Sequence, residues 1–270
     1  MGKRDIRLFY SRRRNGEINF GDDISPMLFE AITGQSVCHA RVSNCDFAAV
    51  GSLLEMLVDR RLKRLRKFRF DPVRVWGSGC LTGEGQVSSF LLDPIALRGP
   101  VTRARLGDRH DVPLGDPGLL FDRLHTPKRE KTYKWGIVLH YTDVDSPVLR
   151  QMLETTPGVV NIPVNAPPME TLRLIGECEC IASSSLHGLI AADCYGIPNV
   201  RLRVEKHLDP TNSKFLDYAA AIGRPDIAAI QAPDHGSLDA IYKPEDADLS
   251  YFEAIPKVAE ALERALQRAV

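Results

Sequence analysis

The chain has 270 residues, of which 44% are hydrophobic and 26% are charged. This composition is typical of a soluble protein with room for one large or two medium α/β domains. Because 35 basic residues balance 35 acidic ones, no global positive field indicates a nucleic acid partner. No stretch approaches the roughly 18 apolar residues of a membrane span and no apolar leader is visible, so we expect a cytoplasmic location.

The N-terminal half predicts strands that alternate with helices. Residues 6–10 have the alternation of a strand. Ser25 followed by Pro26 begins a helix, because serine caps the first turn and proline loses no hydrogen bond there, and Gly34 ends it. The further elements predicted in this half are strands at 47–54, 73–76 and 95–98 and a helix that begins at Pro100.

The C-terminal half repeats the alternation after a charged stretch at 123–134 that we interpret as a linker. Its predicted elements are strands at 136–140, 158–162, 178–182 and 197–202 and helices at 146–154, 168–176 and 186–195. Such alternation predicts parallel sheets with helices on both faces. We therefore predict an N-terminal α/β domain at 1–125 and a C-terminal α/β domain at 126–270, with an amphipathic last helix in 251–270 that packs on a domain.

The most informative motif is Ser183-Ser184-Ser185-Leu186-His187-Gly188, where a predicted strand gives way to a helix. The first amides of a helix have no intrahelical partner, and the helix dipole favours an anion there. The serines add hydroxyl donors, and His187 can move a proton near neutral pH. The motif predicts an anion site with a proton donor. Alternatively, the serines cap the helix and the histidine packs against the loop.

Other polar clusters follow the carboxyl ends of predicted strands, where open parallel sheets bind ligands. They are Asn19-Phe20-Gly21-Asp22-Asp23, Gly77-Ser78-Gly79, the arginines Arg98 and Arg103, and His140. Adjacent carboxylates can hold sugar hydroxyls or act as a base, and arginine binds phosphate or carboxylate with a planar fork. Solvated turns, surface charges and a structural histidine are the alternatives.

Taken together, the motifs resemble the polysaccharide pyruvyl transferase family, and within it the bacterial exopolysaccharide branch of succinoglycan- and xanthan-type ketal pyruvyltransferases. The resemblance runs over roughly residues 5 to 225 and rests on the segments 19–22, 76–79, 98–103, 115–117, 183–188 and 214–218. It implies a GT-B-like α/β fold, with two Rossmann-like domains whose parallel sheets face a central cleft. It also implies phosphoenolpyruvate as the donor, with neither a cofactor nor a metal.

The resemblance further implies transfer of the enolpyruvyl unit to a sugar hydroxyl pair of a lipid-linked oligosaccharide, which forms a cyclic ketal and releases phosphate. In that scheme His187 is the general acid and Asp22 is the base or orienting group. The donor-binding residues would be Arg98, Arg103, Ser183, Ser184, Ser185, Gly188 and Lys214. The residues lining the acceptor side or the cleft would be Asn19, Gly21, Asp23, Gly77, Ser78, Gly79 and His140.

One departure from the family pattern leaves the donor's cationic partner open. Many members carry an arginine two positions before the histidine, where this chain has Ser185. The charge would then come from Arg98, Arg103, Arg201 or Lys214. A GT-B glycosyltransferase that uses a nucleotide-sugar donor and a non-catalytic polysaccharide-assembly subunit are the alternative functions.

A basic segment at 60–70 carries Leu62, Leu65, Phe68 and Phe70 among its cations. Such a segment is suited to an anionic membrane surface. It predicts peripheral attachment at the inner face of the cell membrane, beside a lipid-linked acceptor. The alternative is a solvated helix whose leucines pack on the first domain.

Overall fold

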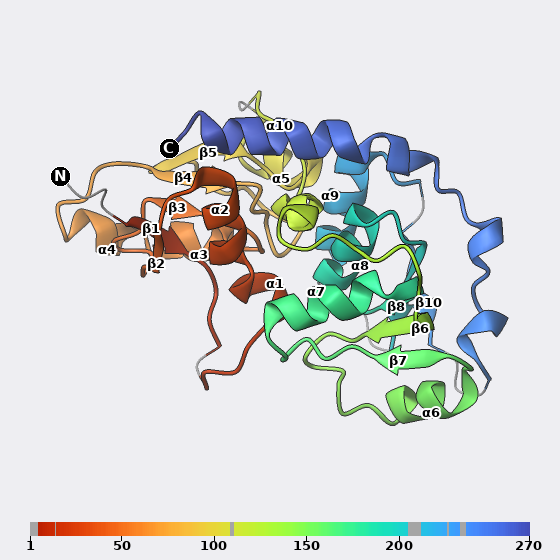
Figure 1. Ribbon diagram of the computed structural model, residues 1–270. Coiled ribbons are helices and arrows are strands. Elements are labelled where there is room, and N and C mark those ends of the chain that lie inside the picture. The colour runs from red at the N-terminus through yellow and green to blue at the C-terminus, as the bar shows by residue number, and fades with distance from the viewer. Residues whose placement is uncertain (1–4, 14, 109–110, 205–211, 226, 233–235) are drawn as a thin grey trace.

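The computed structural model describes residues 5–13, 15–108, 111–204, 212–225, 227–232 and 236–270. Figure 1 shows two α/β units side by side. The N-terminal unit contains the strands β1 (Ile6–Phe9), β2 (Val37–His39), β3 (Phe47–Ala48), β4 (Val73–Trp76) and β5 (Leu92–Ala96). The C-terminal unit contains β6 (Tyr133–Val138), β7 (Val159–Asn161), β8 (Cys178–Ser183), β9 (Asn199–Arg203) and β10 (Ile230–Gln231).

Both sheets are parallel and share one topology. The strand orders are β2-β1-β3-β4-β5 and β10-β9-β8-β6-β7. Counted within its own unit, each sheet therefore has the doubly wound order 2-1-3-4-5, in which ligands bind beyond the carboxyl ends of the first and third strands. The predicted α/β class with two Rossmann-like units is confirmed, and the paired units give a GT-B-like arrangement.

Helices connect the strands and cover the sheets. In the N-terminal unit they are α1 (Phe20–Asp23), α2 (Ser25–Thr33), α3 (Leu54–Asp59), α4 (Arg61–Leu65) and α5 (Pro100–Arg105). The 3₁₀ segment η1 (Pro117–Arg123) leads into the C-terminal unit, which has α6 (Pro147–Thr155), α7 (Pro168–Gly176), α8 (Leu186–Cys194) and α9 (Asn212–Ile222). The chain ends with the 3₁₀ segments η2 (Leu238–Ala240), η3 (Pro244–Asp246) and η4 (Ser250–Glu253) and helix α10 (Ile255–Gln267).

Local chemistry explains where several predicted elements begin and end. Helix α2 starts at Ser25 with Pro26 in its first turn, and Gly34 ends it in the left-handed conformation at φ +63°. The strand predicted within 47–54 is present at Phe47–Ala48, and the chain then turns at Gly51, whose φ of +115° suits glycine. At this turn the Gly51 carbonyl accepts hydrogen bonds from Ser78 and Gly79 in the loop that follows β4.

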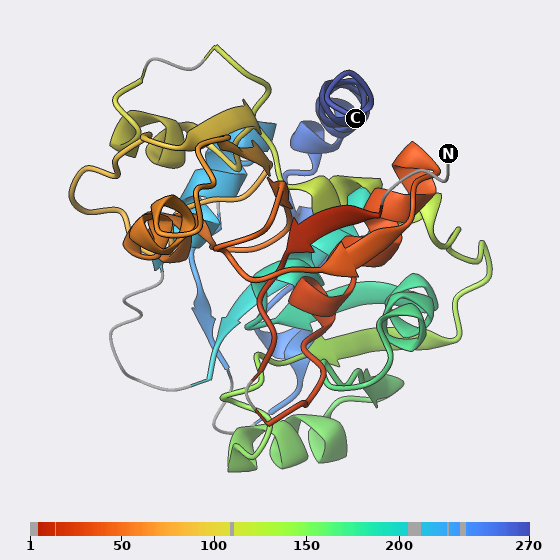
Figure 2. The same ribbon diagram turned by 90° about the vertical axis from the view of Figure 1, so that its left-hand side faces the viewer.

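The last helix returns to the N-terminal unit. Helix α10 packs against α2, β4 and β5, and Figure 2 shows it almost end-on beside that unit. Its buried side chains are Ile255, Ala259, Leu262 and Leu266. The Trp76 indole Nε1 donates a hydrogen bond of 2.9 Å to the Leu262 carbonyl. The chain therefore crosses between the units twice, and the second crossing ties them together.

The basic segment 60–70 contains one arginine that is part of the interior. Arg64 is 1% exposed, and its guanidinium donates to the carbonyls of Val42, Cys45 and Asp71. A buried carbonyl without a donor is costly, so this arginine holds two loops together. The expectation that the whole segment lies at the surface is corrected at this position.

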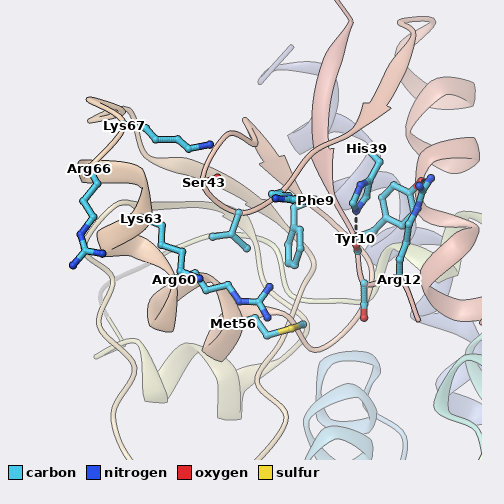
Figure 3. Close-up of a pocket in the computed structure, with 13 residues that line it drawn as sticks. Phe9, Tyr10, Arg12, His39, Ser43, Met56, Arg60, Lys63, Arg66 and Lys67 are labelled. Carbon is cyan, nitrogen blue, oxygen red and sulfur yellow. Dashed lines mark hydrogen bonds between the residues drawn. The ribbon is translucent and has the colours of Figure 1, made fainter. Parts of the chain in front are cut away.

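The apolar residues of the same segment mostly point outward. Leu62 is 60% exposed, Phe68 83% and Phe70 64%. The alternative in which the leucines pack on the domain is therefore wrong for Leu62. Figure 3 shows the basic side chains of Arg60, Lys63, Arg66 and Lys67, from the segment that contains α4, along one wall of a hollow in the N-terminal unit.

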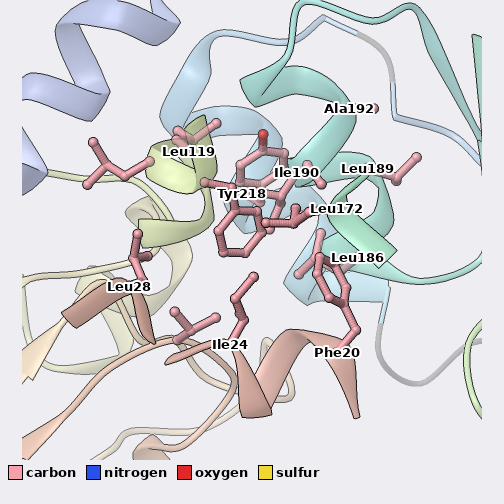
Figure 4. Close-up of a cluster of buried hydrophobic side chains, with 14 of the residues drawn as sticks. Phe20, Ile24, Leu28, Leu119, Leu172, Leu186, Leu189, Ile190, Ala192 and Tyr218 are labelled. Atoms are coloured by element: carbon pink, nitrogen blue, oxygen red, sulfur yellow. The ribbon is translucent and has the colours of Figure 1, made fainter. Parts of the chain in front are cut away.

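A continuous apolar cluster joins the two units. Phe20, Ile24 and Leu28 from the N-terminal unit pack in one core with residues of α7, α8 and η1. Figure 4 shows this cluster, in which Leu186 lies beside Phe20. Burial of apolar surface contributes on the order of 25 cal/mol per Å². The cluster therefore fixes α1 against the beginning of α8, where the predicted site residues lie.

Candidate functional site

The imidazole of His187 packs on the backbone of Gly21, across the junction of the two units. His187 is the second residue of α8, which follows β8 at the carboxyl edge of the C-terminal sheet. A Cβ added to Gly21 would lie only 1.9 Å from His187 Nδ1. A side chain at position 21 would therefore displace the histidine. The structure brings these two predicted site residues together.

The other ring nitrogen of His187 has no partner. Its Nε2 atom is buried and makes no hydrogen bond to any residue that the structure describes. Buried polar atoms are almost always satisfied, so such a nitrogen points to a ligand. Burial, together with the charges of Lys214 and Arg98, lowers the pKa of His187 to about 3. The ring is therefore neutral at pH 7 while no anion is bound.

Asp22 lies on α1, one residue after Gly21. Its Oδ2 accepts a 2.6 Å hydrogen bond from Asn19 Nδ2. Burial raises the pKa of the Asp22 carboxyl to about 7, while Lys214 acts in the opposite direction. The group is thus about half ionised near neutral pH, as a base or orienting group requires. Asp23 instead accepts from the Asn19 amide at 2.7 Å and closes the turn.

Arg98 is held by the protein, which corrects its predicted contact with the donor. The side chain is 1% exposed, and its Nε donates to Asp217 Oδ2 at 3.1 Å. Its Nη1 donates to Ser52 Oγ at 2.8 Å and its Nη2 to the Cys80 carbonyl at 2.5 Å. The guanidinium also packs on Gly79, where an added Cβ would lie 2.3 Å from its Cζ. Arg98 therefore contributes positive potential at His187 through the field rather than through contact.

The four cations considered for the place of the absent arginine lie in different surroundings. Arg103 donates to Asp108 at the surface at 2.9 Å, and its predicted donor contact stays a prediction. Arg201 is buried with its guanidinium 3.6 Å from the centre of the Phe215 ring. Lys214, on α9, is the largest charge that acts on the pKa of His187. That Lys214 binds the donor stays a prediction.

Ser183 shapes the loop rather than facing a ligand. Its Oγ donates to the Val138 carbonyl at 2.7 Å and accepts from the Ser185 amide at 3.0 Å. A Cβ added to Gly188 would lie 2.4 Å from that hydroxyl. The Ser183 hydroxyl is therefore occupied within the loop, whereas a donor contact of Gly188 through its backbone amide stays a prediction. The Ser185 side chain makes no cap bond to α8, so its hydroxyl is the one that can turn to a ligand.

Ser184 and His140 form a second polar group at the same edge of the sheet. Ser184 Oγ donates to Asp143 Oδ2 at 2.6 Å and accepts from the His140 amide at 2.9 Å. The His140 ring contacts Thr142 Oγ1 at 2.8 Å and is one of the charges that lower the pKa of His187. His140 thus lies near the catalytic candidate, while the Ser184 hydroxyl is occupied by Asp143.

The Gly77-Ser78 turn packs against neighbouring loops of the protein. Gly77 has φ +68°, and a Cβ there would lie 2.3 Å from Pro117 Cδ. Ser78 is buried, and its Oγ donates to the Gly51 carbonyl at 2.7 Å. The predicted cleft-lining role of both residues is corrected, since they join the β3, β4 and η1 loops.

Two buried carboxyl groups at this junction had no functional role in the sequence interpretation. Asp217 accepts from Arg98 and from the Thr102 amide and hydroxyl. Asp116 Oδ1 accepts from the Gly118 backbone amide at 2.9 Å and so caps η1, but its buried Oδ2 has no partner among the described residues. Burial raises the pKa of Asp116 to about 6. For Asp217, the sequence signal is its place in the segment 214–218, which contributes to the family resemblance.

The fold and this junction define an α/β protein whose two parallel sheets bring an anion-favouring loop and a carboxyl group together. Residues 86–206 match the family model of the polysaccharide pyruvyl transferases, which confirms the family resemblance predicted from the motifs. Over 129 residues, 25% are identical to the succinoglycan biosynthesis protein ExoV of Rhizobium meliloti (strain 1021), which covers 47% of this chain and 40% of ExoV. An uncharacterized protein of Acanthamoeba polyphaga mimivirus is 27% identical over 221 residues, which covers 77% of this chain and 72% of that protein.

Solved structures give weaker similarities. A functionally uncharacterized protein from Klebsiella pneumoniae subsp. pneumoniae superposes with a TM-score of 0.48 at 13% identity, over 84% of this chain and 93% of that one. The glycotransferase of kitacinnamycin superposes with a TM-score of 0.31 at 13% identity, over 53% of this chain and 42% of that one.

Proposed function

We propose that this chain transfers the enolpyruvyl unit of phosphoenolpyruvate to a hydroxyl pair of a sugar in an exopolysaccharide repeat unit, and so forms a cyclic pyruvate ketal with release of phosphate. The observation that carries the proposal is the unpartnered Nε2 of His187, buried beside Lys214 at the beginning of α8. The match to the polysaccharide pyruvyl transferases supports the reaction class. The similarity to ExoV, a succinoglycan biosynthesis protein, supports an exopolysaccharide as the acceptor.

The electrostatics of the junction suit an anionic donor. Phosphoenolpyruvate carries a phosphate and a carboxylate, which the α8 amides, the Ser185 hydroxyl and the Lys214 ammonium would bind. The negative charge of the donor would oppose the field of Lys214 and Arg98, and would raise the pKa of His187 from its low value. Donor binding would thus place a proton on the histidine only when there is a substrate to receive it.

The proposed reaction begins with proton transfer to the donor. His187 gives its proton to the methylene carbon, and C2 becomes an electrophile with oxocarbenium character. One sugar hydroxyl adds to C2 and passes its proton to Asp22. The bond from C2 to the phosphate oxygen then breaks, and the departing phosphate takes the proton from Asp22. The second hydroxyl adds to C2 to close the ketal, and its proton returns to His187. Arg98 would stabilise the departing phosphate through its field rather than by contact.

The proposed reaction is tested by phosphate release. We expect release from phosphoenolpyruvate only when a lipid-linked oligosaccharide acceptor is also present, together with acceptor product heavier by one pyruvyl group in the mass spectrum. UDP- and GDP-sugars serve as control donors. Turnover of a nucleotide sugar without any use of phosphoenolpyruvate would instead identify a glycosyltransferase, and the absence of both reactions would favour an assembly subunit.

No helix in the described part of the chain is long and apolar enough to cross a bilayer.

We propose that the outward-facing Leu62, Phe68 and Phe70 insert into an anionic membrane surface, with the neighbouring cations beside the lipid head groups. We expect replacement of these three residues by serine to reduce sedimentation with anionic vesicles, because their apolar surface would no longer leave water. Arg64 is left unchanged, because it is buried.

The matched control for the vesicle experiment replaces two apolar residues that are exposed elsewhere, Leu81 and Phe90. This variant should sediment like the parent chain. Equal sedimentation of the parent chain and the Leu62, Phe68 and Phe70 variant would rule out membrane insertion by this segment.

A further inference from the structure

A hollow of about 780 Å³ opens in the N-terminal unit, away from His187. Figure 3 shows its two walls. Tyr10 and Arg12, which follow β1, and His39 at the end of β2 form one wall, while side chains of α3, α4 and the turn after α4 form the other. The hollow therefore lies at the carboxyl edge of the N-terminal sheet, where parallel sheets bind ligands.

The charged side chains that line the hollow are all positive. Its charged residues are Arg12, Arg41, Arg60, Lys63, Arg66 and Lys67, and no carboxylate lines it. None of these six forms an ion pair with any carboxylate in the part of the chain that the structure describes. The chain as a whole has a formal net charge of zero. Six uncompensated cations around one concave surface focus the field and attract a multivalent anion.

The remaining lining residues are suited to a ligand that is more than a bare ion. Phe9, Tyr10 and Met56 present apolar surface in the hollow. The Arg12 guanidinium stacks on the Tyr10 ring, 4.9 Å from its centre, and His39 Nε2 contacts the Tyr10 carbonyl at 3.3 Å. Aromatic faces beside cations bind a sugar or an apolar chain next to an anionic group.

The hollow is distinct from the place where the donor would react. The charges that act on the pKa of His187 are Lys214, Arg98 and His140, and none of the six cations of the hollow is among them. However, the loop that begins at Tyr10 on its wall ends at α1, which carries Asp22. A ligand held in the hollow could therefore extend along this loop toward the catalytic junction.

We propose that this basic pocket binds the diphosphate of a glycosyl carrier, so that the saccharide attached to it reaches Asp22 and His187. The inference rests on the proposed function, because it names the part of the acceptor that the protein recognises. A diphosphate carries more negative charge than a single phosphate, so it gains more from six cations around one concave surface. The diphosphate could belong to a lipid carrier or to a nucleotide, which share this chemistry.

The test is direct binding, measured by calorimetry at fixed ionic strength, since exposed charges are screened by salt. The variant replaces Arg41, Arg60 and Lys63 by glutamine, three exposed residues whose loss leaves the core intact. We expect its affinity for inorganic diphosphate to fall about tenfold or more, because three charge-assisted contacts are removed. The matched control replaces Arg150, Lys257 and Arg268 by glutamine, which changes the net charge equally at exposed sites outside the pocket, and should bind diphosphate like the parent chain.

Further probes identify the source of the diphosphate. Tighter binding of geranylgeranyl diphosphate than of UDP assigns the pocket to a lipid carrier, and the reverse order assigns it to a nucleotide. Unchanged diphosphate affinity in the triple variant, or equal affinity of the parent chain for inorganic phosphate and diphosphate, would overturn the proposal. Because binding is measured without turnover, a failure of phosphoenolpyruvate-dependent phosphate release would count against the proposed reaction and leave the binding result standing.

Discussion

Replacement of His187 by glutamine is expected to lower pyruvyl transfer by about 10²–10⁴-fold, the range typical of a lost general acid. Glutamine keeps a polar group at the buried site but cannot deliver a proton. Binding of phosphoenolpyruvate should persist, because Lys214 and the amides of α8 remain. The measurements are steady-state phosphate release and calorimetric donor affinity.

The protonation of His187 gives a second readout of this prediction. The free side chain has its pKa lowered to about 3, so it carries no proton at pH 6. Anion binding raises that pKa, and donor binding should therefore take up a proton in the parent chain. Calorimetry in buffers of different ionisation enthalpy measures this uptake. An Asp22→Asn variant should retain the proton uptake that is due to His187.

A matched control for the histidine is His125→Gln, which changes a partly buried histidine that contacts Tyr195 outside the junction. This variant should turn over normally. If His187→Gln also turned over normally, or if proton uptake were the same in the parent chain and the variant, His187 would not be the acid.

The regular elements of the fold could be predicted because their signals are local. The helix at 168–176 and the strand at 73–76 have the predicted boundaries. In contrast, β2 was missed. Its three residues are partly or fully exposed at the edge of the sheet, so they lack the apolar run or alternation that indicates a strand. Its position depends on pairing with β1, which no local pattern encodes.

The location of the site was also predictable, but the partner of each side chain was not. Strand ends indicated the loops that carry Asp22 and His187, because ligands of parallel sheets bind there. The same reasoning could not tell that Ser183 is consumed by the Val138 carbonyl. Nor could it tell that Arg98 pairs with a residue 119 positions away. A serine or an arginine beside a strand end suits a ligand and a buried partner equally, and only burial distinguishes the two.

Replacement of Arg98 by methionine is expected to lower the free energy of unfolding by about 3–5 kcal/mol, the cost of removing one partner of a buried ion pair. Arg98 and Asp217 are each 1% exposed, with the Nη2 to Oδ2 distance at 3.1 Å. Without the guanidinium, the Asp217 carboxylate would keep only the Thr102 amide and hydroxyl as donors. Urea unfolding measures the change.

The control for Arg98 lies on the helix that follows it. Arg103→Met breaks the ion pair with Asp108. The Arg103 side chain is 33% exposed and the Asp108 side chain 68%, and exposed pairs contribute about 1 kcal/mol or less to stability. The double variant Arg98→Met with Asp217→Leu should recover part of the lost stability, because the uncompensated charge is removed. Equal unfolding midpoints for Arg98→Met and Arg103→Met would contradict the structural role. If Arg98→Met weakened donor binding without changing the unfolding midpoint, Arg98 would be a donor-binding residue. We expect the opposite result, because the Arg98 guanidinium hydrogen-bonds to Asp217, Ser52 and Cys80 and so joins α9 to the N-terminal unit.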